Sequence, residues 1–235
     1  MLSLEEIKEF CKGKSIIIVG NSSRLLNERH GKLIDSYDIV VRINKGYFYR
    51  QNFYSDKIGN KTTILSLGLK SATMSANVIQ ANTVKYLISP IIHSERLDYA
   101  NVYDVQENTY NDLKNSLGGF KPSTGISTYN FFNRYINFNK LDLIGFDFFE
   151  SSARQRNQLG HCYVKDHHGI KESKFFESSK DPEKTILHPI HGSNTAIINN
   201  LPEYSQLNLI VKNNNRKWAV EKLKALHKIL SHTEM

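Results

Sequence analysis

The sequence predicts an α/β protein with a single, mostly parallel sheet that is covered by helices on both faces. Residues 16–19, 39–41 and 141–144 are short apolar runs rich in branched side chains, which is typical of buried parallel strands. These runs alternate with helical patterns along the chain, as expected for a parallel sheet with covering helices. A chain of 235 residues is long enough for one well-buried domain, so we expect a single domain over residues 1–235.

Local signals predict the remaining elements in order. Ser3 and Glu6 form a capping-box pattern at the start of a helix near the N-terminus. Further strands are predicted over residues 62–67, 83–88 and 207–211, and further helices over residues 71–80 and 124–136. The polar stretch after Glu150 lacks periodicity, so a flexible, lid-like segment is expected at about 150–187. A basic helix is expected at about 214–231.

Charge and hydropathy limit the classes of partner. The net charge of +8 favours an anionic partner, which includes nucleic acid, an acidic membrane surface, a nucleotide donor and an acidic glycan. No apolar run approaches the roughly 18 residues of a membrane-spanning helix, and the two cysteines form neither a disulfide framework nor a metal-binding pair. We therefore expect a cytoplasmic protein. The helix at about 214–231 is interpreted first as packed on the sheet, with peripheral docking at the inner face of an anionic membrane as the alternative.

Polar residues follow the first two predicted strands. The first strand turns at Gly20, Asn21 and Ser22, and the second ends in Arg42 and Asn44. The carboxyl ends of parallel strands are where open α/β sheets bind ligands. The loop lacks the G-x-G-x-x-G pattern, and Arg42 stands where a dehydrogenase would have an acidic residue, which disfavours a nicotinamide dehydrogenase.

This stretch resembles the large sialylmotif of the sialyltransferase family. The matching residues are V-G-N-S at 19–22 and G-K-L-I-D-S-Y-D at 31–38, followed by Arg42 and Asn44. The resemblance implies a variant of the A-type glycosyltransferase fold and a CMP-sugar donor. It implies that Asn21 and Asn44 hold the nucleotide, with Gly20 and Ser22 beside them in the donor site.

A second motif, P-S-T-G, stands at residues 122–125 and precedes an apolar helix and a strand that ends in Gly145 and Phe146. Hydroxyls and backbone N–H groups at a helix N-terminus suit an anion, although the same residues also suit an ordinary helix cap. The order resembles the small sialylmotif. The residues that this resemblance assigns to the cytidine and the sugar carboxylate are Ser123, Thr124 and Gly125, with Gly145 and Phe146 at the strand end beside the nucleotide.

Several of the nine histidines lie after the second motif. His191 begins H-G-S-N-T, which resembles the H-x-x-N-T of bacterial sialyltransferases and implies that His191 is the catalytic base; His188 is the competitor. Ala196 stands where the vertebrate motif has glutamate. The segment H-C-Y resembles the family's H-Y-Y motif and implies that His161 and Tyr163 bind the departing phosphate.

The predicted function is the inverting transfer of an acidic sugar, sialic acid, from a CMP-sugar to a hydroxyl of a glycan or glycolipid acceptor. The chain has no D-x-D pattern, and a donor that leaves a single phosphate fits a transferase without a metal or other cofactor. A Kdo transferase that uses CMP-Kdo is the nearest alternative. A basic nucleic-acid-binding α/β module is the alternative from another class, although nucleic acid is not the expected partner.

Overall fold

The computed structural model describes residues 2–44, 54–68, 84–90, 102–104, 107–149 and 168–191. The chain divides into two compact units: Met1–Ser151 with Tyr163–Ser193, and Ser152–Cys162 with Asn194–Met235. The second unit lies outside the described residues, as do the predicted helix at 71–80, the predicted strand at 207–211 and the predicted basic helix at about 214–231. The single-domain organisation therefore stays a prediction.

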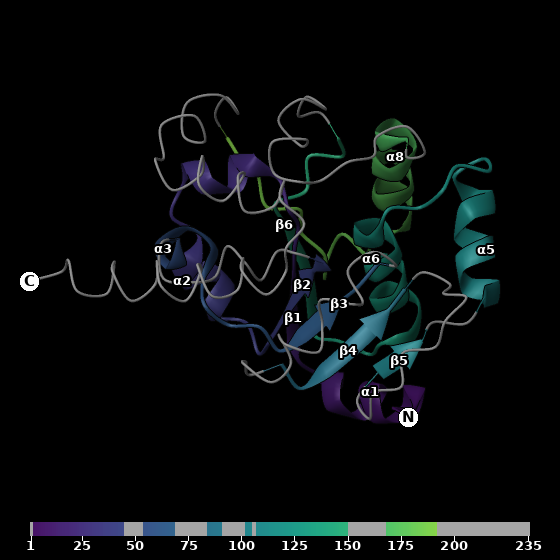
Figure 1. Ribbon diagram of the computed structural model, residues 1–235, viewed down its shortest axis with the longest axis horizontal. Coiled ribbons are helices and arrows are strands. Elements are labelled where there is room, and N and C mark those ends of the chain that lie inside the picture. Colours follow the sequence, from purple (N-terminus) through teal and green to yellow (C-terminus); the bar gives the residue numbers. More distant parts are fainter. Residues whose placement is uncertain are drawn as a thin grey trace, which may run out of the picture. The chain divides into compact units, whose positions relative to one another are not determined.

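The described residues of the first unit form a six-stranded sheet in which every neighbouring pair of strands is parallel (Figure 1). The strands are β1 (Ser15–Val19), β2 (Ile39–Ile43), β3 (Ile64–Ser66), β4 (Tyr86–Ser89), β5 (Val102–Asp104) and β6 (Lys140–Ile144). Their order across the sheet is β5-β4-β3-β2-β1-β6. The predicted parallel α/β sheet is confirmed.

The strand order reverses at β1. Strands β2 to β5 are added one after another on one side of β1, and β6 is added on its other side. The loops that follow β1 and β6 consequently leave the sheet toward opposite faces, and ligands of open α/β sheets bind in the crevice that such a reversal creates. The topology thus locates a candidate site at the carboxyl ends of β1 and β6.

Alternate residues of the central strands supply the cores of the two faces. Ile16 and Ile18 of β1 belong to one buried cluster, and Ile17 and Val19 belong to the other. The first face is covered by α1 (Leu4–Cys11), α5 (Glu107–Ser116), α6 (Thr124–Tyr135) and α8 (Gly169–Ser179). The second face is covered by η1 (Ser23–Asn27), α2 (Gly31–Asp35) and α3 (Ser55–Ile58), on the opposite side of the sheet in Figure 1. Both faces are covered, as predicted.

Helix α1 begins with the predicted capping box. The backbone N–H of Ser3 donates to Glu6 Oε2 at 2.8 Å, and the backbone N–H of Glu6 donates to Ser3 Oγ at 3.2 Å. The helix buries Ile7 and Cys11 against the sheet. Burial raises the pKa of the Cys11 thiol to about 12, so this cysteine is a core residue.

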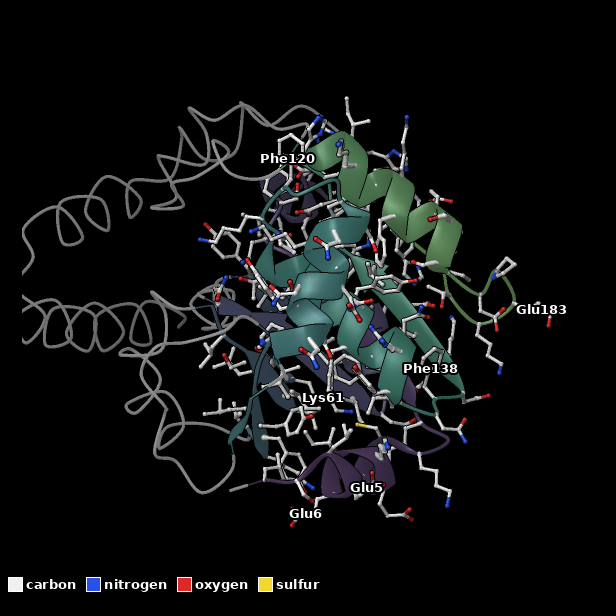
Figure 2. The ribbon with its side chains drawn as sticks, turned by 90° about the vertical axis from the view of Figure 1, so that its right-hand side faces the viewer. Glu5, Glu6, Lys61, Phe120, Phe138 and Glu183 are labelled. Carbon is white, nitrogen blue, oxygen red and sulfur yellow. The ribbon has the colours of Figure 1, made fainter. Side chains whose placement is uncertain are left out.

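Helix α8 lies within the segment predicted to be lid-like, and the prediction of irregular structure is wrong for residues 169–179. Tertiary contacts stabilise this largely polar helix. Phe176 is fully buried, and its ring centroid lies 4.9 Å from that of Tyr129 in α6. Figure 2 shows α8 alongside α6, with Phe120 near the start of α8. Helix α5 and strand β5 were also not predicted.

Among the helices in the described part of the chain, none has the length and apolar character needed to cross a bilayer.

Candidate functional site

The predicted donor-binding residues gather at the carboxyl ends of β1, β2 and β6 and at the start of α6. Asn21 follows β1, and its Nδ2 donates to the carbonyl of Ile43 in β2 at 3.0 Å. Asn44 follows β2, and its Nδ2 donates to Thr124 Oγ1 in α6 at 3.2 Å. Residues that are far apart in sequence therefore lie side by side at one edge of the sheet.

Gly20 and Gly145 bring the backbones of the loops after β1 and β6 into close contact. The Gly20 N–H donates to the carbonyl of Ile144 at 2.7 Å, and the Ser22 N–H donates to the carbonyl of Gly145 at 3.0 Å. A Cβ on Gly20 would overlap the Gly145 carbonyl. Gly145 itself has φ 76°, a conformation that favours glycine. The two loops can meet in this way because both positions lack a side chain.

Asn44 is held on both sides of its amide. Besides the bond from Nδ2 to Thr124, its Oδ1 accepts the backbone N–H of Gly68 at 2.6 Å. Its φ is 50°, in the left-handed region where asparagine is among the better tolerated residues. The side chain therefore ties β2, the residues after β3 and the start of α6 together.

Helix α6 begins at the predicted P-S-T-G motif. Ser123 is the N-cap, and its Oγ accepts the backbone N–H of Ile126 at 3.3 Å. The Ser123 N–H and hydroxyl donate to the two carboxylate oxygens of Glu172 in α8 at 2.8 and 2.7 Å. Ser123 is thus an N-cap bound to α8, and its predicted contact with the donor stays a prediction.

Thr124 and Gly125 are the first two residues of α6. The backbone N–H groups of Thr124 and Gly125 have no acceptor among the described residues. Such groups at a helix N-terminus bind anions, helped by the helix dipole. A Cβ on Gly125 would lie 2.8 Å from a ring carbon of Phe146, so Phe146 packs against the start of the helix.

Ser22 and Asp147 join the loops after β1 and β6. Ser22 Oγ donates to Asp147 Oδ2 at 3.1 Å and accepts the backbone N–H of Arg24 at 3.3 Å. The Phe149 N–H donates to the other carboxylate oxygen of Asp147 at 3.1 Å. This pair of side chains helps to fix the loop that carries Asn21.

Two further residues of the first motif support the fold around the site. The fully buried guanidinium of Arg42 donates to the carbonyl of Ile58 at 2.6 Å and to Thr62 Oγ1 at 3.0 Å. The Asp35 carboxylate accepts the backbone N–H groups of Asn60 and Lys61, each at 2.9 Å. Together they hold the turn between α3 and β3.

His188 and His191 lie on an extended segment, residues 185–191, which we call the strap. It runs parallel to β6 at the outer edge of the sheet: the Leu143 N–H donates to the carbonyl of Ile186 at 2.9 Å, and the His188 N–H donates to the carbonyl of Leu143 at 2.8 Å. At the end of the strap, Asn27 Nδ2 in η1 donates to the carbonyl of His191 at 2.8 Å. The exposed His191 is thereby placed beside η1, which follows the Gly20–Ser22 loop.

His188 points into a polar cluster around the fully buried Asp142 of β6. Its Nε2 lies 2.7 Å from Asp142 Oδ2, which is also bound by Lys140 Nζ at 2.8 Å and by the hydroxyl of Tyr37. Burial and the hydrogen bond to Asp142 raise the pKa of Tyr37 to about 12. Burial would raise the pKa of Asp142, but the hydrogen bonds from its three side-chain partners and from the backbone N–H of Ile186 outweigh it and lower that pKa.

The structure thus brings most of the predicted site residues to one edge of the sheet. Those that gather at the ends of β1, β2 and β6 and at the start of α6 are Gly20, Asn21, Ser22, Asn44, Ser123, Thr124, Gly125, Gly145 and Phe146. His191 lies at the end of the strap beside η1. His161 and Tyr163 lie outside the described residues.

Sequence reasoning did not assign a role to Asp142, Tyr37 or Glu172. A signal for Asp142 was available, because it is an acidic residue between two leucines of a strand, and a buried carboxylate must find partners. Glu172 offered no such signal, since it stands in a polar stretch. The described residues contain no group of three or more side chains arranged to hold a metal ion.

Comparisons with known proteins cover the first motif. Residues 8–100 match the profile of glycosyltransferase family 29 (sialyltransferase). A β-1,6-galactosyltransferase from Arabidopsis thaliana, GALT29A, is 44% identical over 50 residues, covering 21% of this chain and 12% of that protein. Sialyltransferase-like protein 2 from the same plant is 30% identical over 117 residues, covering 48% of this chain and 26% of that protein. The matches therefore span about an eighth and a quarter of these relatives.

Solved structures share the fold. A mammalian sialyltransferase is similar with a TM-score of 0.53 at 20% identity, covering 78% of this chain and 71% of that chain. The structure of a mammalian sialyltransferase in complex with Gal-beta-1-3GalNAc-ortho-nitrophenol gives a TM-score of 0.52 at 22% identity, covering 78% and 72%. The resemblance to the sialyltransferase family and the predicted variant of the A-type glycosyltransferase fold are confirmed.

Proposed function

We propose that this chain, which carries the sequence pattern and the fold of the sialyltransferase family, transfers sialic acid from a CMP-sugar to a hydroxyl of a glycan acceptor. The observation that carries the proposal is the convergence of Asn21, Asn44 and the first turn of α6 where the strand order reverses. This is where α/β sheets bind nucleotides. The family match over residues 8–100 supports the reaction class.

The groups at this edge suit a nucleotide that carries an acidic sugar. Amide side chains both donate and accept hydrogen bonds, as a pyrimidine and a ribose require, and Asn21 and Asn44 supply two of them. The N–H groups of Thr124 and Gly125 suit the phosphate or the sugar carboxylate. Gly20 and Gly145 let the loops after β1 and β6 meet at this edge, beside Asn21.

Transfer is proposed to be a single displacement with inversion. The acceptor hydroxyl gives its proton to His191, its oxygen forms a bond to the anomeric carbon, and the bond from that carbon to the CMP oxygen breaks. A histidine suits this role because its ordinary pKa lies near neutrality. His161 and Tyr163 are proposed to stabilise the negative charge that develops on the departing phosphate, and no metal ion is required.

Kdo and galactose are the two alternatives to sialic acid as the transferred sugar. CMP-Kdo has the same nucleotide and also bears a carboxylate, so the residues described here suit both donors. The name of GALT29A describes a galactosyltransferase, and that relative is 44% identical over 50 residues. The nucleotide preference separates a CMP-sugar donor from a donor of another type. The family match and the shared fold favour these transferases over the nucleic-acid-binding alternative.

A thermal-shift panel with CMP, CDP, UDP and NAD in excess EDTA tests the proposed donor class. We expect CMP to raise the unfolding temperature more than the other three nucleotides. An equal or larger shift with UDP would indicate that the donor is a UDP-sugar. A shift with NAD alone would overturn the transferase proposal. Stabilisation by CMP that requires added magnesium or manganese would overturn metal-independent binding.

The membrane interpretation concerns residues 214–231, which carry several lysines and leucines. A basic amphipathic helix would hold the enzyme at an anionic surface where a glycolipid acceptor lies. Deletion of residues 215–235 should then reduce binding to phosphatidylserine vesicles and leave CMP binding intact. Insolubility of the truncated chain would favour a packed helix instead.

A further inference from the structure

One carboxylate oxygen joins three separate segments of the chain. Asp142 Oδ2 in β6 accepts from the hydroxyl of Tyr37, which follows α2, and lies 2.7 Å from Nε2 of His188 in the strap. Lys140 Nζ lies 2.8 Å from the same oxygen. The other oxygen, Oδ1, accepts the backbone N–H of Ile186 at 3.1 Å. Asp142 therefore binds the strap through both of its carboxylate oxygens.

The hydrogen-bond pattern assigns a direction to the contact with His188. The carboxylate of Asp142 can only accept, so the Nε2 atom of His188 carries a proton and donates it. The hydroxyl of Tyr37 donates its single proton to Asp142, so it does not donate to Nε2 of His188. Nε2 of His188 consequently serves as an anchor on Asp142 and is not available to accept a proton from an acceptor sugar.

The contact determines which side chain of the strap reaches the Asp142 carboxylate. Residues on both sides of His188 cannot replace it, because Leu187 and Pro189 have no side-chain donor. Beyond them, Ile190 packs against the buried cluster of the second face, and the carbonyl of His191 accepts from Asn27. A shift of the strap by one residue would break all of these contacts and move His191 away from η1.

We propose that Asp142 and His188 are positioning residues that fix the register of the strap and so place His191 at the carboxyl edge of the sheet. The proposal rests on the proposed function, in which His191 accepts the proton of the acceptor. It assigns the two histidines different roles: His188 holds the strap through Nε2, and His191 carries out the proton transfer.

The test compares His188→Gln with His188→Ala in the full chain. The amide nitrogen of glutamine can donate to Asp142 from about the position of Nε2, but an amide cannot act as a general base. We expect His188→Ala to lower kcat about tenfold or more with unchanged CMP affinity. We expect His188→Gln to recover kcat to within about threefold of the wild type, with the same loss of activity on the acid side of the pH profile.

Hydrogen exchange of the strap provides a readout that does not depend on activity. His188→Ala should speed amide exchange in residues 185–191 and leave exchange in α1 unchanged, while His188→Gln should exchange like the wild type. If amides of the strap exchange in His188→Ala at the same rate as in the wild type, His188 has no positioning role. A glutamine variant as inactive as His191→Ala would make His188 the base. A wild-type protein without transfer would contradict the proposed function, and the exchange measurement would still decide the role of His188.

Discussion

Gly20 and Gly145 approach each other so closely at the ends of β1 and β6 that a side chain on Gly20 would overlap the backbone of Gly145. A Cβ on Gly145 would likewise lie 2.9 Å from the Gly20 carbonyl oxygen. The contact stands where the strand order reverses. The candidate donor site therefore depends on two backbones that meet without side chains between them.

Gly20→Ala is expected to separate the two loops. Because the atoms in the way belong to backbone, the variant should lose about 1–3 kcal/mol of unfolding free energy and bind CMP at least about tenfold more weakly. Gly119→Ala is the control, since a Cβ there meets nothing within 4 Å. That control should cost only backbone strain at its positive φ and leave CMP affinity unchanged. Calorimetry that finds wild-type CMP affinity for Gly20→Ala would remove this contact from the site.

Asn21→Ala is expected to weaken CMP binding about tenfold while the fold stays intact. The variant loses one hydrogen bond to the carbonyl of Ile43, which contributes about 1 kcal/mol to stability. Asn133→Ala is a matched control, because Asn133 Nδ2 also donates to a backbone carbonyl, that of Ser179, at 3.1 Å. Both variants should lose similar stability in urea, and only Asn21→Ala should lose CMP affinity. Equal CMP affinities would exclude Asn21 from nucleotide binding.

Glu172→Ala should destabilise the protein through the start of α6. Glu172 is buried and accepts two hydrogen bonds from Ser123, and leaving those donors without their acceptor costs about 1–3 kcal/mol. Glu177→Ala is the control on the same helix, because its carboxylate is half exposed and pairs with Lys180 at the surface. That control should change stability by at most about 1 kcal/mol. Urea midpoints that coincide for the two variants would show that the Ser123 contact contributes little.

Asp142→Asn should make the unfolding free energy depend less steeply on pH in the acid range. The pKa of Asp142 is lowered in the folded protein, because hydrogen bonds from His188, Lys140 and Tyr37 outweigh the opposing effect of burial. Its contribution to stability is therefore present above the unfolded pKa of about 3.9 and is lost as the pH falls through the lower, folded value. Urea midpoints measured below about pH 4 should fall less steeply in Asp142→Asn than in the wild type. Identical slopes would contradict the lowered pKa.

Much of the sheet could be predicted from the sequence because its strands are short apolar runs that end in glycine or polar residues. This pattern predicts β1, β2 and β6, and helical periodicity predicts α6. The roles of Asn21 and Asn44 come from the resemblance to the large sialylmotif and stay predictions. The alternation of strands and helices also predicted that both faces of the sheet are covered.

Other features depend on tertiary contacts and could not be predicted from local patterns. Helix α8 is largely polar, and the burial of Phe176 against Tyr129 becomes visible only once α6 and α8 lie side by side. The contact between Asp142 and His188 joins residues 46 positions apart, and neither the strand pattern nor the histidine motif indicates that they meet.

The formation of CMP from CMP-sialic acid in the presence of a galactose-terminated acceptor, measured in excess EDTA, tests the central claim most directly. The wild-type protein should release CMP together with an equal amount of sialylated product. His191→Ala should be slower by roughly 10²–10⁴, as expected for the loss of a general base, and should bind CMP like the wild type. Transfer from CMP-Kdo and not from CMP-sialic acid would show that the transferred sugar is Kdo. No release of CMP from either donor, or a fully active His191→Ala, would contradict the account.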